Sequence, residues 1–295
     1  MKKIGIITVL YNSEKVLKDF FDSLNMQTFK NFTLYIVDNK SPDKSLELAE
    51  KLSKNADFSS VIIKNEANFG VAKGNNIGIK QALKDGCKYI LLSNNDITLE
   101  QNTIEKLFND AIKNKAMISI PKIYYWGTNK IWCAGGYFTK LTGCTKHIGV
   151  LEEDVGQFDK PRKTEYAPTC FMLINCDVFH LVGLMDERYF VYFDDTDFIF
   201  RVNSKKIKIW YFPDSIVWHK ESVSTGKGSP FSAYYFSRNI LLFNRKNRNI
   251  LFAYFILFQH FFLLLISNDR VKNRETWLAA WRGLRDGMKF LIRKI

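Results

Sequence analysis

The chain has 295 residues, 46% of them apolar, so it can bury a sizeable core, and we expect one main domain with an appendage. Its five cysteines are odd in number and form no Cys-x-x-Cys pair, which argues against a zinc site or a full disulfide framework. The net charge of +13 is C-terminal, because residues 1–200 hold 25 basic and 25 acidic residues whereas residues 201–295 hold 18 and 5. The total charge therefore does not by itself indicate nucleic-acid binding.

The first hundred residues alternate short β-branched runs with helical patterns, which predicts an α/β fold with a parallel sheet covered by helices. The expected strands are Ile4–Val9, Thr33–Val37, Ser60–Lys64 and Tyr89–Leu92, and the expected helices are Ser13–Gln27, Ser45–Ser53 and Val71–Asp85. In open α/β sheets the ligand binds beyond the carboxyl ends of the strands. The candidate contacts are therefore the polar residues that follow the strands: Thr8, Asn12, 38–41, 65–74 and 93–96.

Asn94-Asn95-Asp96 directly follows the apolar strand Tyr89–Leu92, so we expect its side chains at the carboxyl edge of the sheet. A carboxylate there can hold Mg²⁺ or Mn²⁺ across a diphosphate, because these ions bind through one or two carboxylates together with phosphate oxygens. The same tripeptide also fits an ordinary turn, and this segment alone leaves both interpretations open.

Three carboxylates, those of Asp194, Asp195 and Asp197, lie within four residues between the aromatic runs Tyr189–Phe193 and Phe198–Phe200. Crowded carboxylates that are partly removed from water repel one another and raise a pKa, which prepares a general base near neutral pH. Acidic residues also favour the first turn of a helix. Both can hold, with Asp194 or Asp195 facing a site and Asp197 capping the helix.

Two later segments are weaker candidates. His219 follows the strand-like run Ser215–Val217, where an imidazole can bind a metal or a phosphate, although a lone histidine is more often structural. Arg238 follows Tyr234-Tyr235 and suits a diphosphate, but an ordinary arginine near a membrane gives the same pattern.

The most apolar run of the chain, Ile250–Ile266, has basic residues on both sides. They are Arg245, Lys246 and Arg248 before it, and Arg270, Lys272 and Arg274 after it. Such flanks favour an anionic membrane surface, and the run is short for a crossing, which needs about 20 residues. A buried helix packed on the main domain is the alternative. Because only a short apolar run opens the chain, no secretory signal peptide is expected, and we place the protein in the cytoplasm, peripheral on the inner face of the membrane.

Six segments in order carry a family resemblance: ITVLYNSEKVLKDFFDSL, LYIVDNKSPDKS, NEANFGVAKGNNIGI, LLSNNDI, MLINCDVFHLVGLMDERYFVYFDDTDFIFRV and WHKESVSTG, followed by YFSRN. Together they resemble the large inverting family-2 glycosyltransferases of the GT-A fold, particularly the rhamnosyltransferase-like members that build bacterial surface polysaccharides. The resemblance runs from Ile4 to about Asn244, with a weaker echo at Leu278–Gly287. It implies a GT-A catalytic domain at 1–240, with a nucleotide-sugar half at 1–100 and an acceptor half at 101–240. Amphipathic helices at 241–295 would form a membrane-associating tail.

The resemblance also implies a site residue by residue. On the donor side, Thr8 and Asn12 would line the nucleotide pocket, Asp38 would contact the base or ribose, and Gly70, Lys73 and Asn76 would border the donor. Asn94 and Asp96 match the outer positions of the Asp-x-Asp metal motif, with Asn95 between them, and His219 matches a further metal or diphosphate contact. Asp195 matches the catalytic base, with Asp194 beside it, Asp197 as a supporting acid and Arg238 as a leaving-group clamp.

Three positions depart from the family pattern. Asn94 replaces the first acid of the metal motif, so metal binding would depend mainly on Asp96. Asp194 replaces the commoner Glu beside the base, which is a mild change. Thr169-Cys170 replaces a usual Gly-Ala in the acceptor half, which leaves the acceptor open.

The implied reaction transfers a sugar, with inversion, from dTDP-rhamnose or a UDP-sugar to a hydroxyl of a glycan or a polyprenyl-diphosphate-linked glycan. Its cofactor would be Mg²⁺ or Mn²⁺. A homodimer is compatible with the sequence, and nucleic acid is not an expected partner. One alternative is a sugar nucleotidyltransferase, although Thr8–Glu14 is not the Gly-rich loop of that class. The other is a non-enzymatic basic module that binds membranes or nucleic acid, which only the charge supports.

Overall fold

The computed structural model describes residues 3–220, 228–267 and 272–292. Strands and helices alternate over the first part of the chain as β1 (Ile4–Leu10), α1 (Glu14–Asn25), β2 (Phe32–Asp38), α2 (Ser45–Lys54), β3 (Ser59–Lys64), α3 (Gly70–Lys84) and β4 (Tyr89–Ser93). These are the elements expected from the sequence, with bounds that differ by at most two residues.

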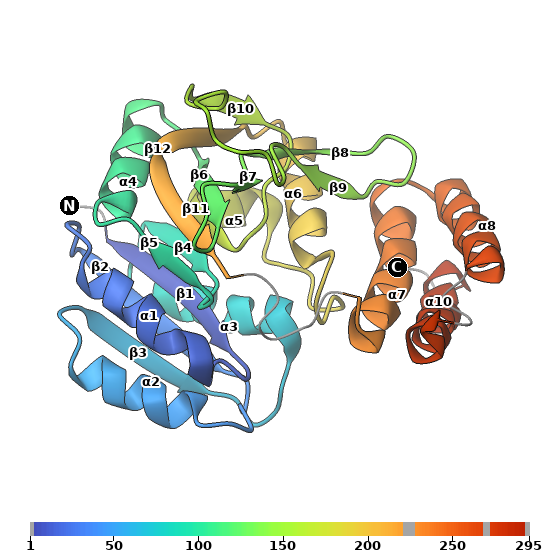
Figure 1. Ribbon diagram of the computed structural model, residues 1–295, viewed down its shortest axis with the longest axis horizontal. Coiled ribbons are helices and arrows are strands. Elements are labelled where there is room, and N and C mark those ends of the chain that lie inside the picture. Colours follow the sequence, from blue (N-terminus) through green and yellow to red (C-terminus); the bar gives the residue numbers. More distant parts are fainter. Residues whose placement is uncertain (1–2, 221–227, 268–271, 293–295) are drawn as a thin grey trace.

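The middle of the chain adds shorter strands and three more helices (Figure 1). They are β5 (Ile97–Leu99), α4 (Thr103–Lys113), β6 (Ile118–Tyr125), β7 (Ile131–Cys133), β8 (Gly136–Phe138), β9 (Thr145–His147), β10 (Arg162–Thr164), β11 (Phe171–Asn175), α5 (Asp177–Val182), α6 (Asp194–Ser204) and β12 (Ile209–His219). The three acids of the cluster thus lie in the first turn of α6.

Among the described residues, the main sheet has ten strands in the order β10-β12-β6-β11-β4-β1-β2-β3, with β5 beside β12 and β7 beside β6. Six strands, β1 to β4, β6 and β12, run in one direction, while β11 is antiparallel to both of its neighbours. Helices α1, α2 and α4 contribute to the core on one face, and α3, α5 and α6 contribute to the core on the other. The predicted α/β fold with a mostly parallel sheet is therefore confirmed, and β2 is buried along its whole length because both faces are covered.

Three helices end the described chain: α7 (Pro230–Asn247), α8 (Ile250–Ile266) and α10 (Arg274–Ile292). In Figure 1 they form a separate layer to the right of the sheet. Helix α10 packs closely along α7, because Gly283 and Gly287 have no side chains to hold the backbones apart: a Cβ at Gly283 would lie 2.1 Å from the carbonyl oxygen of Tyr234. The division expected at residue 240 falls inside α7.

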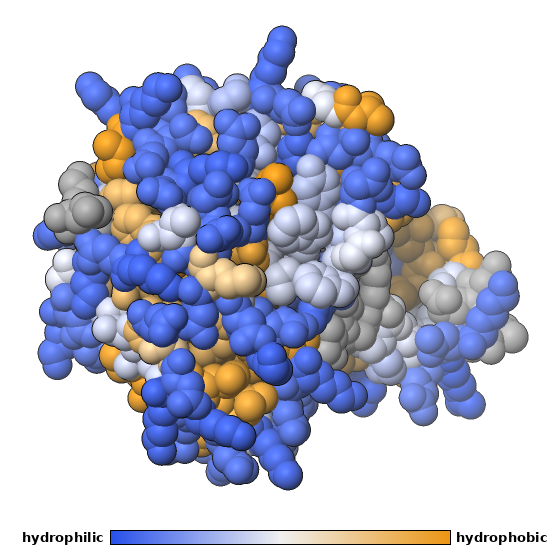
Figure 2. All heavy atoms as spheres, turned by 60° about the vertical axis from the view of Figure 1, so that its left-hand side comes forward, coloured by the Kyte–Doolittle hydropathy of each residue, from blue (hydrophilic) through white to orange (hydrophobic). Residues whose placement is uncertain are grey.

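Helix α8 is apolar apart from Gln259 and His260 but buries only Ala253 and Ile256. Phe258 is 69% exposed and Phe262 61% exposed, so α8 is not the buried helix that the alternative interpretation required. Orange atoms gather at the right of Figure 2, at the end of the molecule where Figure 1 places these helices. Over the three described ranges, no helix combines the length and apolar character needed to cross a bilayer. Arg270, one of the expected basic flanks, and residues 221–226 of WHKESVSTG lie outside the described residues.

Candidate active site

A cavity of about 960 Å³ opens beyond the carboxyl ends of β1, β2 and β4. Its wall combines the loops after these strands, the start of α3, the segment 190–196 and the first turns of α7. The residues with a predicted role in the site that lie on this wall are Gly70, Asn94, Asn95, Asp96, Asp194, Asp195 and His219. Asn39, Asn68 and Ser93, from the candidate ranges after the strands, also lie on it. A second hollow of about 750 Å³, beside Lys122 and Asp154, contains none of the predicted site residues.

Asp96 and His219 meet at one end of this cavity, although 123 positions separate them. The antiparallel pairing of β5 with β12 places His219 opposite Ile97, the residue after Asp96. The imidazole Nε2 lies 3.1 Å from Oδ1 of Asp96, and the Trp132 ring packs edge-on against the imidazole. Burial acts to raise the pKa of Asp96, but the hydrogen bond and charge of His219 outweigh it and hold that pKa below its ordinary value.

The donor set of Asp96 and His219 fits a divalent cation. A carboxylate oxygen and an imidazole nitrogen are both ligands that divalent cations accept, and these two atoms lie 3.1 Å apart on the cavity wall. Among residues 3–220, 228–267 and 272–292, no group of three His, Cys, Asp or Glu side chains is arranged to hold a metal. Phosphate oxygens and water would therefore have to complete the coordination, which is how Mg²⁺ is commonly bound.

The two asparagines of the motif lie on the cavity wall beside Asp96. The side chain of Asn94 acts to lower the pKa of Asp96, and its backbone N–H donates to the carbonyl oxygen of Cys170 at 2.8 Å. Asn95 donates to the carbonyl oxygen of Val9 at 2.8 Å, which ties this loop to β1, and its amide lies 3.5 Å from Oγ1 of Thr8.

Asp195 is held by three hydrogen bonds at the cavity wall. Tyr166 donates from its hydroxyl to Oδ2 at 2.5 Å, while the backbone N–H and hydroxyl of Thr196 donate to Oδ1 at 2.6 and 3.1 Å. Together these donors fix the orientation of the carboxylate. Tyr166 was not predicted, because it lies 29 positions before Asp195 in a segment with no motif.

The surroundings of Asp194 shift its pKa. Its side chain is buried, and burial together with the adjacent charge of Asp195 raises the pKa of Asp194 to about 8. At neutral pH Asp194 is therefore mostly protonated.

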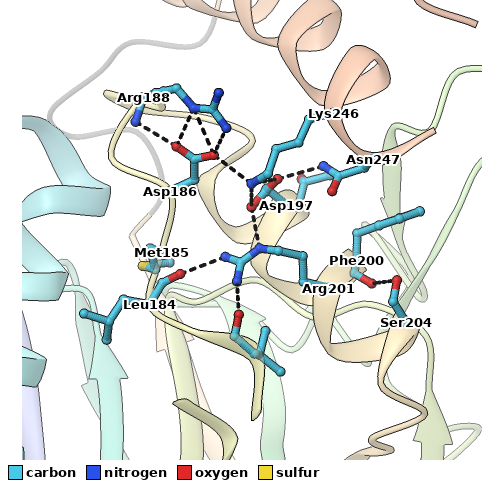
Figure 3. Close-up of polar contacts among 12 residues, drawn as sticks. Leu184, Met185, Asp186, Arg188, Asp197, Phe200, Arg201, Ser204, Lys246 and Asn247 are labelled. Carbon is cyan, nitrogen blue, oxygen red and sulfur yellow. Dashed lines mark hydrogen bonds and ion pairs between the residues drawn. The ribbon is translucent and has the colours of Figure 1, made fainter. Parts of the chain in front are cut away.

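Asp197 is not on the cavity wall and belongs to an ionic network (Figure 3). Its side chain is fully buried, and Lys246 contacts both of its oxygens at 2.7 and 2.8 Å. Arg201 and Asn247 donate to the same carboxylate at 2.9 and 2.7 Å. Lys246 also contacts Asp186 at 2.7 Å, so this network joins α6, α7 and the loop before α6.

The backbone that leads into the acid cluster is strained. Tyr192 and Phe193 have φ angles of +61° and +64°, a left-handed conformation that costs non-glycine residues about 1–2 kcal/mol each. Asn239 of α7 stabilises this turn, because its amide donates to the carbonyl oxygens of Val191 at 2.8 Å and Tyr192 at 3.0 Å. Asn239 is a neighbour of the predicted Arg238, within the segment YFSRN.

Gly70 connects α3 to the same region. Its φ is +80°, and a Cβ at this position would lie 2.2 Å from the carbonyl oxygen of Phe190. Val71 donates its backbone N–H to that oxygen at 2.6 Å. Glycine is therefore needed at position 70 because the backbone packs closely against the loop before the acid cluster, in addition to lining the cavity.

Six other predicted residues lie outside the cavity wall as formed by the described residues: Thr8, Asn12, Asp38, Lys73, Asn76 and Arg238. Thr8 is fully buried, Asn12 has a φ of +54°, and Asp38 accepts a hydrogen bond from the backbone of Ser41. Lys73, Asn76 and Arg238 contact other residues of the protein.

Lys73, Asn76 and Arg238 are occupied by contacts within the protein. The ammonium of Lys73 lies 3.7 Å from the centre of the Phe69 ring, and the amide of Asn76 bonds the backbone of Met185. The guanidinium of Arg238 donates to the carbonyl oxygen of Arg188 at 3.1 Å and to Oδ1 of Asn239 at 2.5 Å. In this conformation Arg238 supports Asn239 and does not face the cavity.

The fold and this cavity, with Asp96 and His219 at the edge of the sheet and Asp194 and Asp195 in the first turn of α6, are those of a glycosyltransferase of the GT-A type. The sequence model described as Glycosyl transferase family 2 matches residues 5–183, more than half of the chain. The chain therefore belongs to glycosyl transferase family 2.

Two curated relatives are similar over most of the chain. The dTDP-rhamnosyl transferase RfbF of Shigella flexneri is 29% identical over 83% of this chain and 80% of its own length. The glycosyltransferase GlyG of Streptococcus pneumoniae is 24% identical over 74% of this chain and 70% of its own length.

Solved structures share the fold at low sequence identity. TarS 1–349 of S. aureus in complex with UDP-GlcNAc superposes with a TM-score of 0.60 at 17% identity, covering 98% of this chain and 81% of that one. GalNAc-T7 with UDP, GalNAc and Mn²⁺ gives 0.61 at 15% identity, covering 80% and 48%. At such identities the likeness establishes the fold alone.

Proposed function

We propose that this glycosyltransferase moves a sugar, with inversion, from a nucleoside diphosphate donor to a hydroxyl of a glycan or lipid-linked glycan in the synthesis of a surface polysaccharide. One observation carries this proposal: Asp195 and the Asp96–His219 pair face the same cavity at the carboxyl edge of the sheet. The relative that transfers rhamnose from dTDP supports dTDP-rhamnose as the donor, and the neighbour in complex with UDP-GlcNAc supports a UDP-sugar.

Asp195 is the proposed general base. It takes the proton from the acceptor hydroxyl as that oxygen attacks the anomeric carbon, and the bond to the diphosphate breaks on the opposite side. Asp194 is a poorer choice, because with a pKa of about 8 it already carries a proton at neutral pH. Its uncharged form spares Asp195 a second negative charge at its side.

Asp96 and His219 would hold a Mg²⁺ or Mn²⁺ ion. When bound, the ion would neutralise charge that develops on the departing nucleoside diphosphate. Asn95 fixes the loop that carries Asp96 against β1. Gly70 and the loops after β1 and β2 provide the wall against which the nucleotide would bind.

The C-terminal helices support a location on the cytoplasmic face of an anionic membrane. Helix α8 exposes a row of apolar side chains that includes Phe255, Phe258 and Phe262, while Arg285 and Lys289 of α10 carry exposed charge. An apolar surface with basic neighbours suits anionic lipid. A polyprenyl-linked acceptor would be confined to that surface, so docking would bring the cavity to its substrate. A second copy of the chain is the other partner that could cover α8.

A donor screen tests the reaction. Purified protein is incubated with dTDP-rhamnose and a panel of UDP-sugars, with and without Mn²⁺, and release of the nucleoside diphosphate is measured. The proposal predicts metal-stimulated release from one of these donors, which Asp195→Asn abolishes although nucleotide binding remains. Synthesis of a sugar nucleotide from a nucleoside triphosphate and a sugar phosphate would instead show a nucleotidyltransferase. Near-wild-type turnover by Asp195→Asn would reject the assignment of the base.

A further inference from the structure

One face of α7 contacts the acid segment along its length. Asn239, Phe243 and Lys246 are spaced four and three residues apart, so they lie on the same side of the helix. Each contacts a different part of the segment 191–200, from the strained turn to the second turn of α6.

The first contact is at the left-handed turn. The buried amide of Asn239 donates to Val191 and Tyr192, and its own oxygen accepts from Arg238. Both amide hydrogens of Asn239 thus bind the two carbonyl groups that precede Phe193, the residue before Asp194. No apolar side chain of similar size can supply these two hydrogen bonds.

The second and third contacts hold α6. The ring of Phe243 lies between Phe193 and Phe200, with ring centres 5.7 and 5.5 Å away. Lys246 binds the carboxylate of Asp197, in the same first turn of α6 as the acids that face the cavity (Figure 3). The strained turn and the start of α6 are therefore held from a single helix.

The opposite side of α7 is itself fixed. Gly283 and Gly287 bring α10 against the backbone of α7 at Tyr234 and Arg238. A helix held in this way gives its side chains a defined position relative to the sheet.

We propose that Asn239 and Lys246 are positioning residues for Asp195: α7 holds the turn before α6 in its left-handed form and thereby aims the carboxylate at the acceptor. Neither residue is on the cavity wall, so neither touches the substrates. This inference rests on the proposed role of Asp195. It assigns to a helix of the C-terminal layer a part in catalysis, not only in attachment to a surface.

The test uses matched variants of the full chain. Asn239→Leu and Lys246→Met remove the two contacts, and Lys246→Arg retains the charge. Asn244→Leu is the control, because Asn244 is also fully buried on α7 but donates to Thr142 and Ile240, away from the acid segment. Melting temperature, kcat, the donor KM and amide hydrogen exchange of residues 190–200 are measured for each.

We expect Asn239→Leu and Lys246→Met to lower kcat about 100-fold, as small displacements of a catalytic group do, with donor KM changed by less than about threefold. Lys246→Arg should recover most of the lost rate, and Asn244→Leu should lose stability but keep kcat. Amide hydrogen exchange of residues 190–200 should become faster in Asn239→Leu and Lys246→Met but not in the other variants. Unchanged kcat in both variants, or an equal loss in Asn244→Leu, would overturn the inference while leaving the transferase function intact. If the wild-type chain transfers no sugar, the proposed function fails instead, and exchange at 190–200 alone decides whether α7 holds the turn.

Discussion

The hydroxyl of Tyr166 lies 2.5 Å from Oδ2 of Asp195. The side chain of Tyr166 is buried, and its ring stacks against His147. Burial, together with the charge of Asp195, raises the pKa of Tyr166 well above its ordinary value, so the phenol keeps its proton and remains a donor. The orientation of the proposed base therefore depends on a residue that lies 29 positions earlier in the chain.

Replacing Tyr166 by Phe should lower kcat about 10- to 100-fold, because a hydrogen bond to a charged group contributes about 1.5–3 kcal/mol. Steady-state kinetics on the donor identified in the screen would measure this effect. Tyr137→Phe is the control, since Tyr137 is 42% exposed on β8. Equal kcat values for the two variants would show that Tyr166 does not position Asp195.

The metal assignment predicts a change in cation dependence. Asp96→Asn should raise the Mn²⁺ concentration for half-maximal activity at least about tenfold, because the amide removes the charged ligand of the pair. His219→Ala should also raise the Mn²⁺ concentration for half-maximal activity. The matched control is His180→Ala on the exposed side of α5. Mn²⁺ titrations of donor hydrolysis and of nucleotide binding would both report the effect, and an unchanged Mn²⁺ dependence in Asp96→Asn would exclude this site.

The raised pKa of Asp194 predicts an effect of pH on stability. With a folded pKa of about 8 and an ordinary value of 3.8, the folded chain binds more protons at this site than the unfolded chain between pH 4 and 8. The contribution of Asp194 to stability therefore falls as pH rises through that window. Asp194→Asn, which cannot ionise, should gain melting temperature relative to wild type as the pH is raised from 5 to 8. Exposed Asp177→Asn should show a constant difference, and a constant difference for Asp194→Asn would contradict the raised pKa.

Gly70 and Gly86 provide a matched pair of alanine substitutions. Their φ angles are +80° and +79°, but a Cβ at Gly86 meets no atom within 4 Å whereas one at Gly70 would collide with Phe190. Gly86→Ala should cost about 1–2 kcal/mol for the backbone alone. Gly70→Ala should cost more and should also reduce activity, because Phe190 leads into the acid cluster. Equal losses of stability in chemical denaturation would mean that the contact with Phe190 contributes nothing.

The exposed face of α8 predicts binding to anionic vesicles. Phe258→Glu combined with Phe262→Glu should abolish sedimentation with phosphatidylglycerol vesicles, while pure phosphatidylcholine should bind the wild type weakly. Leu181→Glu, on α5, places the same charge on another exposed apolar side chain and should have no effect. A double variant that still sediments would refute docking through α8. A wild type that forms dimers, which the double variant dissociates, would identify a second copy as the partner.

Local pattern was enough to predict the parallel half of the sheet, because β-branched runs and amphipathic helices alternate clearly up to Ser93. It also placed Asp96 at the strand edge and the acids at a helix start. The family resemblance singled out His219, and pairing between β5 and β12 brings it to Asp96.

The contacts that orient these groups could not be predicted in the same way. Arg238 and Asn239 are neighbours in sequence, but successive helical residues point about 100° apart, so only the rotation of α7 decides which one reaches the acid segment. That rotation is set by packing against α10, over a distance of about 50 residues along the chain. Tyr166 likewise reaches Asp195 only through tertiary folding.

Asn239 and Lys246 follow Asp195 by 44 and 51 residues, so α7 is synthesised well after the acid segment that it holds. Chains fold from the N-terminus as they are made, and the sheet edge formed by β1 to β4 can assemble long before α7 leaves the ribosome. With α7 in the role proposed here, a nascent chain would be able to bind a sugar nucleotide before it can consume it. Transfer would begin only after α7 has packed against the acid segment.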